Sequence, residues 1–497
     1  MDFSLYTIIM DILDPFCLFS ICIGVFSGLI IGALPGFTAN MGVALLLPVT
    51  FNLPPVPALV MLASLYTAAI YGGSFSAILL YTPGTSASAA TALDGYPLTC
   101  RGESNKALRI ASFSSVVGGV MSCIALLVLA PPLSYISILF GPSEYFFLAL
   151  FGLTIIGTLA TDNILKGLLA GVIGLCLSLI GQDLDTGFLR YTFGIPELSG
   201  GVAFVPAVIG LFSMAQVFDM CEKTDASIQH TSTAQERKWR IFPLYEEIRE
   251  IKGTMFRSSI IGIIIGLLPG AGGDIGSWTS YNEAKRFSKH KEEFGNGSIE
   301  GISASETANN AVTGSALIPM LTLGIPGSST AAILLGALIM HGLVPGYELF
   351  STHGRITYTV IAGLLFANIV MGFIGMLIAK YASSLARLPK YTLVTPIAIF
   401  AVVGSFAINN SIFDVYVMLI FGFAGYIMRL AGIPAAPIIL GLILGPIAEQ
   451  GLRQTLTLSR GDVFSYCLSK PISLVLIALI ALSIGTSMLR KKKAATS

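Results

Sequence analysis

The sequence has few charged side chains: Asp, Glu, Lys and Arg make up 11% of its 497 residues. A soluble domain carries roughly 25%. Hydrophobic residues make up 54%, and the mean hydropathy is +0.82. This balance excludes a water-soluble fold, a disordered chain and a nucleic-acid-binding protein. The net charge of +1 indicates no strongly acidic or basic macromolecular partner. The composition predicts one polytopic membrane unit.

Several motifs of enzymes and metal sites are also missing. The chain has no GxxxxGK[ST] phosphate loop, no HExxH, no GxSxG and no aspartate-rich prenyl-diphosphate motif. Its seven cysteines form no CxxC pair, and its four histidines lack metal-ligand spacing. We therefore expect neither an enzyme nor a bound cofactor, and no hydrolysis of ATP by a phosphate loop.

Basic residues are absent from the first part of the chain, where the earliest is Arg101. They gather at 220–257 and again at 490–493. The positive-inside rule then places the N-terminus outside, and the central loop and C-terminus in the cytoplasm. The N-terminus lacks the basic start of a cleaved signal peptide, so we expect its first apolar segment to stay as a membrane helix.

Within the central loop, apolar residues recur at helical spacing; they are Leu244, Ile248, Ile251 and Met255. This pattern predicts either an amphipathic helix on the cytoplasmic surface or a solvated linker helix.

Long apolar stretches able to cross a ~30 Å membrane core lie at 15–34, 108–131, 143–160, 163–181, 202–219, 355–380, 390–407, 411–430 and 467–489. Shorter apolar pieces lie at 39–51, 74–82, 86–94, 273–281, 306–324 and 328–342. Pro-Gly or polar residues bound the shorter pieces, which therefore predict broken helices or re-entrant hairpins. The fold expected is all-α, with about ten to fourteen membrane segments.

The chain repeats internally. GLIIGALPGFTANMG (28–42) and GIIIGLLPGAGGDIG (262–276) are identical at eight of fifteen positions. LLYTPGTSASAA (79–90) resembles LTLGIPGSSTAA (321–332), and GTLATDN (157–163) resembles GSFAINN (404–410). Because three pairs keep one order, the pattern indicates a duplication.

The charge pattern gives the two halves opposite orientations, since the first begins on the side without basic residues. We expect two inverted structural repeats, the scaffold of many secondary transporters. The predicted divisions are a first repeat with its N-terminal helix (1–219), a cytoplasmic linker (220–256), a second repeat (257–453), and an extra helix with a basic tail (454–497).

The paired Pro-Gly breaks are the first candidate site. Proline removes a backbone donor and glycine allows unusual backbone angles, so carbonyls and N–H groups are freed at mid-helix. Carbonyls near Gly36 and Gly270 can coordinate a cation, and the following N–H groups attract an anion. The polar residues Thr38, Asn40 and Asp274 follow the breaks, with Asn40 and Asp274 aligned. The alternative is a structural kink that helps helices pack.

Two further groups of polar residues are candidates. Thr85 and Ser86 in the first half, and Ser328, Ser329 and Thr330 in the second, follow Pro-Gly pairs and precede apolar helices. Their hydroxyls and the free N–H groups form a donor-rich cradle for a carboxylate, and they also suit ordinary helix capping.

In the stretch 303–321, Glu306, Asn309 and Asn310 lie on one helical face. Such residues beside an apolar run indicate a cation or substrate site. The alternative is a buried hydrogen-bond network that holds the hairpin.

These strings resemble a known family. SETANNAVTGSALIPMLTLGIPGSSTAAILLGALIMHGLVPGYELF (305–350) is similar to the hallmark region of the large permease subunit of the tripartite tricarboxylate transporters. GLIIGALPGFTANMGVALLLPVTF (28–51), YGGSFSAILLYTPGTSASAATALDGYPL (71–98) and FGNGSIEGISASE (294–306) are similar to the same family, in order over nearly the whole chain.

The resemblance implies a multi-pass protein of the bacterial inner membrane. In that membrane, the orientation predicted from the basic residues gives a periplasmic N-terminus and a cytoplasmic C-terminus. It implies two partners, a small four-helix membrane subunit and a periplasmic solute-binding protein. It also implies cation-coupled uptake, usually with sodium (Na+), by an elevator-like motion. The expected substrates are tricarboxylates, dicarboxylates or aromatic carboxylates.

The combined hypothesis is a secondary transporter. Its substrate site would include Thr38, Asn40, Thr85, Ser86, Asn310, Ser328, Ser329 and Thr330. Its cation site would include Gly36, Asn40, Gly270, Asp274, Glu306 and Asn309. Two other classes of function stay open: a passive anion channel, and a membrane-embedded enzyme with Asp274 and Glu306 as a reactive pair.

Overall fold

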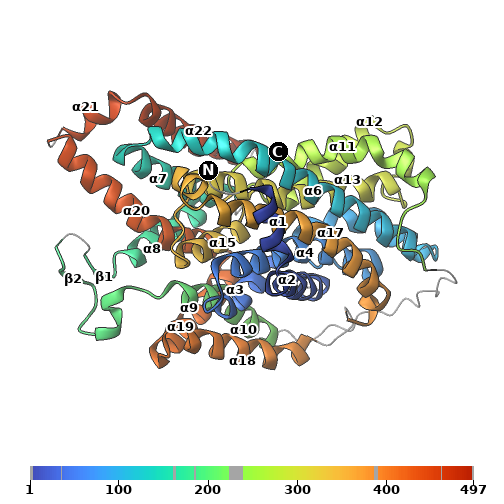
Figure 1. Cartoon of the computed structure of the whole chain (residues 1–497), viewed down its shortest axis with the longest axis horizontal. Helices are drawn as coiled ribbons and strands as arrows, with labels where there is room; N and C mark the ends of the chain where they lie inside the picture. Colours follow the sequence, from blue (N-terminus) through green and yellow to red (C-terminus); the bar gives the residue numbers. More distant parts are fainter. Residues whose placement is uncertain are drawn as a thin grey trace. The chain divides into compact units, whose positions relative to one another are not determined.

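The computed structural model describes residues 4–34, 36–159, 164–183, 186–222, 239–385, 390–460 and 462–494. These residues are almost entirely helical, as the sequence predicts (Figure 1). The strands among them form one short hairpin, β1 (Gly181–Gln182) and β2 (Leu189–Arg190). They pair antiparallel, with Gly181 opposite Arg190 and Gln182 opposite Leu189.

The chain divides into two compact units, each drawn from both halves of the sequence. Unit 1 comprises Met1–Leu133 and Lys223–Val394, and unit 2 comprises Ser134–Glu222 and Thr395–Ser497. Two helices, α6 (Ser104–Ile136) and α18 (Lys390–Asn409), cross the divisions along the chain. The division into two inverted repeats stays a prediction.

The helices of unit 1 are α1 (Leu5–Leu13), α2 (Pro15–Ala33), α3 (Ala39–Thr50), α4 (Pro55–Leu80), η1 (Ser86–Ser88), α5 (Ala89–Cys100), α11 (Tyr245–Leu267), α12 (Gly272–Phe287), η5 (Lys291–Glu293), α13 (Ile299–Ser315), α14 (Leu317–Leu323), α15 (Ser329–Met340), α16 (Tyr347–Ser351) and α17 (Gly354–Leu385). Those of unit 2 are η2 (Ser137–Leu139), α7 (Pro142–Leu159), α8 (Ile164–Ser178), η3 (Pro196–Gly200), α9 (Phe204–Val208), the π-helical turn η4 (Ile209–Met214), α10 (Ala215–Glu222), α19 (Ile412–Leu430), α20 (Ala436–Leu458), α21 (Val463–Leu468) and α22 (Pro471–Ala494).

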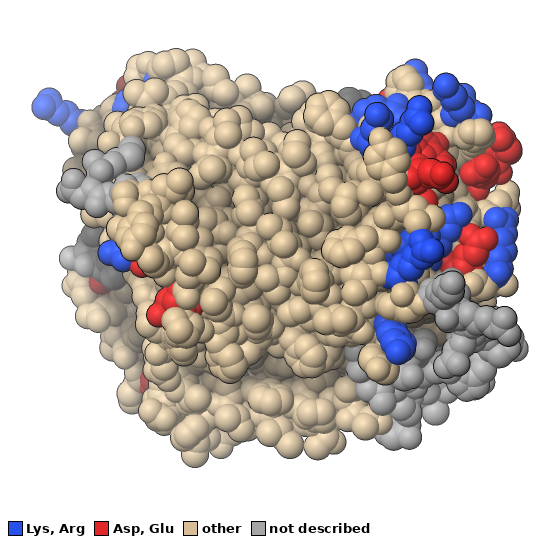
Figure 2. All heavy atoms as spheres, turned by 45° about the vertical axis from the view of Figure 1, so that its right-hand side comes forward, with Lys and Arg blue, Asp and Glu red and all other residues tan. Residues whose placement is uncertain are grey.

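Within the described residues, seven helical segments are long and apolar enough to cross a membrane. They are Pro15–Ala33, Pro55–Leu80, Ser104–Leu139, Phe204–Glu222, Gly354–Ala382, Thr392–Asn409 and Ile412–Leu430. Figure 2 shows a broad face with few charged side chains, and the charged side chains visible there gather mostly along one edge. Several apolar helices make the chain a multi-pass membrane protein. The total number of membrane segments stays a prediction.

One predicted short piece, 74–82, is wrong as a separate element. It forms the end of α4, a continuous helix of 26 residues. The middle of α4 carries Ser64, Thr67, Gly72 and Gly73, all buried inside unit 1. These small and polar residues lower the local hydropathy, so the sequence pattern hides a helix that its neighbours bury almost completely.

The prediction for the central loop is also corrected. Residues 245–255 form the first turns of α11, which continues without interruption to Leu267. Ile251 and Met255 are buried in the core of unit 1, in one cluster with Ile110 and Ile299. Ile251 and Met255 therefore pack against protein, whereas Leu244 is exposed and Ile248 is half-buried. The cytoplasmic position of this segment stays a prediction. The predicted boundary at residue 256 lies inside α11.

Glycines allow the main helix pairs of unit 1 to approach closely. A Cβ atom on Gly28 of α2 would lie 2.5 Å from the Leu65 carbonyl oxygen of α4. A Cβ atom on Gly262 of α11 would lie 2.5 Å from the Ala308 carbonyl oxygen of α13. Because Gly28 and Gly262 are aligned in the repeated segment, the two helix pairs use the same contact.

Candidate functional site

Both helices that carry a repeated Pro-Gly pair end at that pair. Helix α2 ends at Ala33 and α3 begins at Ala39, whereas α11 ends at Leu267 and α12 begins at Gly272. Gly36 and Gly270 have φ angles of +88° and +78°, a region that favours glycine. Pro35 itself lies outside the described residues.

The turns at the two breaks have matching hydrogen bonds. The Leu34 N–H donates to the Ile31 carbonyl at 3.3 Å, and the Leu268 N–H donates to the Ile265 carbonyl at 3.0 Å. One turn further, the Phe37 and Ala271 N–H groups donate to the Leu34 and Leu268 carbonyls, each at 3.2 Å. The repeated sequence around each Pro-Gly pair therefore forms the same turn in both halves of the chain.

Each of the two loops around Gly84 and Gly327, here called tips, is seated on the helix that breaks in its own half. A Cβ on Gly84 would lie 2.0 Å from the Gly32 carbonyl oxygen, and a Cβ on Gly327 would lie 2.5 Å from the Gly266 carbonyl oxygen. The Gly270 N–H also donates to the Gly327 carbonyl at 3.0 Å. No larger residue fits these approaches without a backbone shift.

The short helices after the breaks pack across the two halves. Helix α3 of the first half contacts α15 of the second, and α12 of the second half contacts η1 of the first. In the first contact, the Thr330 hydroxyl donates to the Asn40 side-chain oxygen at 2.5 Å. In the second, a Cβ on Gly273 would lie 3.4 Å from the Ala87 Cβ.

The crossed contacts differ in one chemical respect. Asn40 in the first contact is aligned with Asp274 in the second. Thr330, which donates to Asn40, is aligned with Ala87, and an alanine side chain has no donor for Asp274. Asp274 is exposed in the first turn of α12. Among the described residues, no hydrogen bond or ion pair reaches its carboxylate, whereas Asn40 has a partner. Asp274 is therefore a carboxylate that can accept an external cation or donor.

The second tip is fixed by a hydroxyl pair. Ser328 caps α15, since its oxygen accepts from the Ala331 N–H at 3.1 Å. The Tyr66 hydroxyl of α4 lies 3.0 Å from the same oxygen. Ser328 is buried, whereas Ser329 is half-buried. Ser329 is thus the more accessible of the two serines.

The first tip is held by its own capping interaction. The Ser88 hydroxyl donates to the Thr85 carbonyl at 2.8 Å, and the Thr85 N–H donates back to the Ser88 hydroxyl at 3.4 Å. Thr85 is buried, and Ser86 and Thr38 are exposed. Capping therefore accounts for Thr85. The Thr38 hydroxyl also caps a helix, since it accepts from the Met41 N–H of α3 at 3.3 Å, but its side chain is exposed like that of Ser86.

Glu306 lies at the centre of a buried network. Its side chain has no exposed area. The carboxylate accepts from Thr91 of α5 at 2.6 Å, from Ser115 of α6 at 2.9 Å and from Asn309 at 3.4 Å. Glu306 therefore joins α13 to the helix that follows the first tip. This geometry favours the hydrogen-bond network over a cation site for Glu306.

The neighbouring amides extend this network. The Asn309 side-chain N–H group lies 3.5 Å from the Ala87 carbonyl at the first tip. Asn310 donates to the Asn309 side-chain oxygen at 2.6 Å, and within the described residues its own buried side-chain oxygen has no hydrogen-bond partner. The same holds for the buried Ser277 hydroxyl of α12. Asn310 and Ser277 therefore each have one buried polar atom that the described residues leave unsatisfied.

The sequence alone did not single out Tyr66, Thr91 and Ser115, which hold Ser328 and Glu306. All three lie in apolar helices, where one hydroxyl carries no periodic signal. Their pairing joins residues 191 to 262 positions apart in the chain. Only the tertiary structure brings them to the predicted residues.

The described part of the chain holds no cluster of three or more His, Cys, Asp or Glu side chains able to bind a metal ion. A sodium site needs no such cluster, because carbonyl and amide oxygens with one carboxylate can form it. The predicted cation site is therefore left as a proposal.

Comparison with known proteins decides the family. The profile of the tripartite tricarboxylate transporter TctA family matches residues 18–440. The chain belongs to this family. The resemblance found in the sequence is confirmed, and membership identifies a permease component of a tripartite transporter, in a family of transporters rather than of enzymes.

Two relatives come from Agrobacterium vitis. The family member described here is 37% identical over 457 residues to an uncharacterised 52.8 kDa protein in the TAR-I ttuC' 3' region, covering 92% of this chain and 90% of that protein. It is 36% identical over 218 residues to an uncharacterised protein in the TAR-II ttuC' 3' region, covering 44% of this chain and 90% of that protein. No solved structure matches the chain significantly.

Proposed function

We propose that this TctA-family permease imports organic carboxylates through the bacterial inner membrane by cation-coupled alternating access. A periplasmic solute-binding protein would deliver a tricarboxylate, dicarboxylate or aromatic carboxylate, and a small four-helix membrane subunit would complete the system. The observation that carries this proposal is the pair of broken helices, each with a tip seated on it, whose short helices pack across the two halves.

The proposed substrate site uses donors around the tips. Ser86, Ser329, Thr38 and Asn40 are all at least partly accessible. The N-terminal N–H groups of α3 and α15 carry a partial positive charge, which attracts a carboxylate without a fixed cation. A site of this kind binds an anion weakly enough to release it. Thr85, Ser328, Thr330 and Asn310 would hold these donors in place.

The proposed cation site centres on Asp274. Its carboxylate has no protein partner among the described residues. The neighbouring Gly273 packs against α13, because a Cβ atom added to this glycine would lie 3.5 Å from the Asn309 carbonyl oxygen. In the second half of the chain, the carbonyls near Gly270 and the Asn309 side chain would complete the coordination of the cation. In the first half, Gly36 and Asn40 occupy the positions that align with Gly270 and Asp274. We assign Glu306 to holding the tip, because it already accepts three hydrogen bonds.

Uptake into proteoliposomes tests the proposal. The purified permease, small subunit and binding protein are supplied with labelled citrate, succinate or benzoate, under a sodium gradient, a proton gradient or neither. We expect saturable uptake that needs one of the gradients. Flux that neither saturates nor responds to a gradient would instead support the passive anion channel.

Asp274→Asn is the first predicted variant. It makes the two halves alike at this position and removes the carboxylate with little change of shape. We expect the cation dependence of uptake to be lost, with thermal unfolding unchanged. Glu292→Gln, at an exposed position after α12, is the matched control and should leave coupling intact. Unchanged sodium and proton dependence in Asp274→Asn would remove this residue from the cation site.

A further inference from the structure

Unit 2 contains a cavity of about 390 Å³. It lies between the β1–β2 hairpin, the turn η3, the start of α9 and helix α20. Its polar lining comes from Gln182, Arg190, Ser199, Glu449, Gln450 and Arg453, and its apolar lining includes Leu177, Val202, Phe204 and Leu442. The volume is in the range of small-molecule sites. The tip and break residues are all in unit 1, whereas every residue that lines this cavity is in unit 2.

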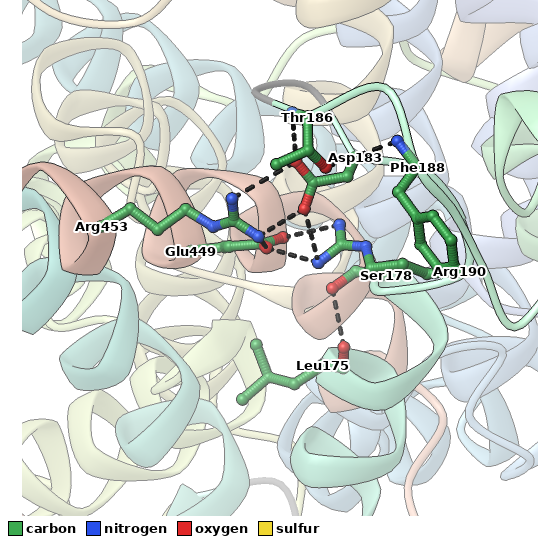
Figure 3. A network of polar contacts seen from close by, with 8 residues as sticks. All are labelled: Leu175, Ser178, Asp183, Thr186, Phe188, Arg190, Glu449 and Arg453. Carbon is green, nitrogen blue, oxygen red and sulfur yellow. Dashed lines mark hydrogen bonds and ion pairs between the residues drawn. The ribbon is translucent and has the colours of Figure 1, made fainter.

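Four charged side chains form a closed ring at this cavity, here called the charge ring (Figure 3). Arg190 contacts Glu449 at 2.5 Å, Glu449 contacts Arg453 at 2.8 Å, and Arg453 contacts Asp183 at 2.5 Å. The ring closes between Asp183 and Arg190 at 3.5 Å. Asp183 and Arg190 come from the hairpin, whereas Glu449 and Arg453 lie one turn apart on α20. Each guanidinium is therefore held in place from two sides.

The acidic members of the ring are already well supplied with donors. Both Glu449 oxygens accept from Arg190, at 2.5 and 3.1 Å. Both Asp183 oxygens accept from Arg453, and one of them also accepts from the Thr186 N–H at 2.9 Å. A bound cation would have to displace an arginine from these oxygens. The ring is therefore unsuited to a metal ion.

One N–H donor of the charge ring, in contrast, has no acceptor among the described residues. Arg190 uses its two terminal nitrogens on Glu449, and its Nε–H is buried with no hydrogen-bond partner among the described residues. A buried N–H group without an acceptor costs free energy, and a guanidinium has five N–H bonds to satisfy. The Ser178 and Ser199 hydroxyls donate to the Leu175 and Pro196 carbonyls, and neither oxygen accepts from Arg190 Nε in the described part of the chain. A ligand for this cavity should bring an acceptor.

We propose that the cavity is a second binding site for a small organic carboxylate. This inference rests on the proposed function for the class of ligand, and on the charge ring for the place. A carboxylate oxygen would accept from Arg190 Nε in a charge-assisted bond after a shift of the side chains that cover this N–H, with Gln450 as a neighbouring donor. The apolar lining would cover the carbon skeleton. Because Asp183 and Glu449 neutralise the ring, binding is weak and reversible, as suits a site that a transported solute occupies briefly.

Cysteine protection in the purified full-length protein tests this site. Gln450→Cys reports on the cavity and Ser86→Cys reports on the first tip; both positions are exposed. N-ethylmaleimide labelling of each peptide is measured by mass spectrometry, which separates the reporters from the native cysteines. With citrate at about ten times its dissociation constant, mass action predicts labelling of Gln450→Cys to be about tenfold slower.

Arg190→Lys gives the discriminating result. Lysine keeps a positive charge toward Glu449 but removes the Nε–H, and we expect citrate to protect Gln450→Cys with about tenfold lower affinity. Arg460→Lys, at an exposed position outside the charge ring, is the matched control and should leave protection unchanged. Thermal unfolding of both variants checks that the fold is retained.

Each outcome decides the proposal. Protection of Gln450→Cys that weakens in Arg190→Lys supports it, whether or not Ser86→Cys is protected. Protection of Ser86→Cys alone overturns it and leaves the proposed function intact. Protection by inorganic phosphate but not by citrate, succinate or benzoate also overturns it, as does protection that is equal in Arg190→Lys. Absence of protection at both reporters overturns the second site, while the uptake assay still decides the proposed function.

Discussion

Glu306 shows how one buried carboxylate can organise a site without touching a solute. Three donors from α5, α6 and α13 meet it, with no basic side chain among them. Burying a carboxylate is costly unless hydrogen bonds replace its water. Once those bonds form, the same group fixes the position of α5, and through α5 the position of the first tip.

Glu306→Ala is predicted to destabilise the protein. Without the Glu306 carboxylate, the buried Thr91 and Ser115 hydroxyls lose their acceptor, which lowers the free energy of unfolding by about 1–3 kcal/mol. The cavity left by the missing side chain lowers it further. Thermal unfolding in detergent measures the effect. Glu306→Gln keeps the shape and one acceptor, so we expect a smaller loss of stability and unchanged cation dependence. Loss of cation dependence in Glu306→Gln without loss of stability would make Glu306 a cation ligand.

The two serines of the second tip are predicted to differ. Ser328→Ala removes the cap of α15 and the contact with Tyr66, and loss of a cap typically costs about 1 kcal/mol. Ser329→Ala, at the half-buried position, should raise the KM for uptake with stability unchanged. Tyr66→Phe is the matched control for Ser328, since it removes only the hydroxyl contact. Equal uptake kinetics in Ser329→Ala and the unmodified protein would contradict a substrate role for Ser329.

At the scale of elements, the central feature is a broken helix with a tip seated on it, formed twice. Gly84 and Gly327 let each tip approach the carbonyl one turn before its break. The short helices after the breaks then exchange partners between the halves, α3 with α15 and α12 with η1. Each tip is therefore followed by a helix that contacts a helix of the other half.

Gly327→Ala is predicted to disturb this arrangement. The added Cβ would lie 2.5 Å from the Gly266 carbonyl oxygen and 2.7 Å from the Ala316 Cα, and both are backbone atoms that cannot rotate away. Overpacking of this kind costs about 1–3 kcal/mol, and we expect uptake to fall with it. Gly253→Ala in α11 is the control, because nothing lies within 4 Å of its added Cβ. There, alanine should be neutral or stabilising, and equal unfolding of the two variants would refute the prediction.

At the scale of the whole molecule, a TctA-family permease that spans a membrane presents a different face to each side of it. The family match covers residues 18–440 and both units contribute to it. The distribution of basic residues is the physical basis for orientation, since positively charged loops remain on the cytoplasmic side.

Thiol labelling from outside is predicted to show this orientation. In a version without the native cysteines, Ser4→Cys should react with an impermeant maleimide in cells whose outer membrane has been permeabilised. Glu292→Cys should react only after the inner membrane is opened. Uptake by both variants confirms that they are folded. The reverse pattern of labelling would invert the predicted topology and place the N-terminus in the cytoplasm.

The sequence by itself determined that the chain is a polytopic membrane protein, which family it resembles and where its helices break. It also identified most of the polar residues of the candidate site. Each of these follows from local composition or short motifs: sparse charge, Pro-Gly pairs and hydroxyls before apolar helices. The buried helix α4, and the burial of Ile251 and Met255 on α11, escaped such reasoning, since both depend on neighbours distant in the chain.

Only the tertiary structure decided which polar groups are already satisfied and which are open. It gave Glu306 its partners Thr91 and Ser115, left Asp274 without one among the described residues, and closed the charge ring around Arg190. Hydrogen bonds and ion pairs between residues about two hundred positions apart leave no periodic trace in a sequence. Their existence depends on how helices pack, and so does the distinction between a residue that holds a site and one that meets a solute.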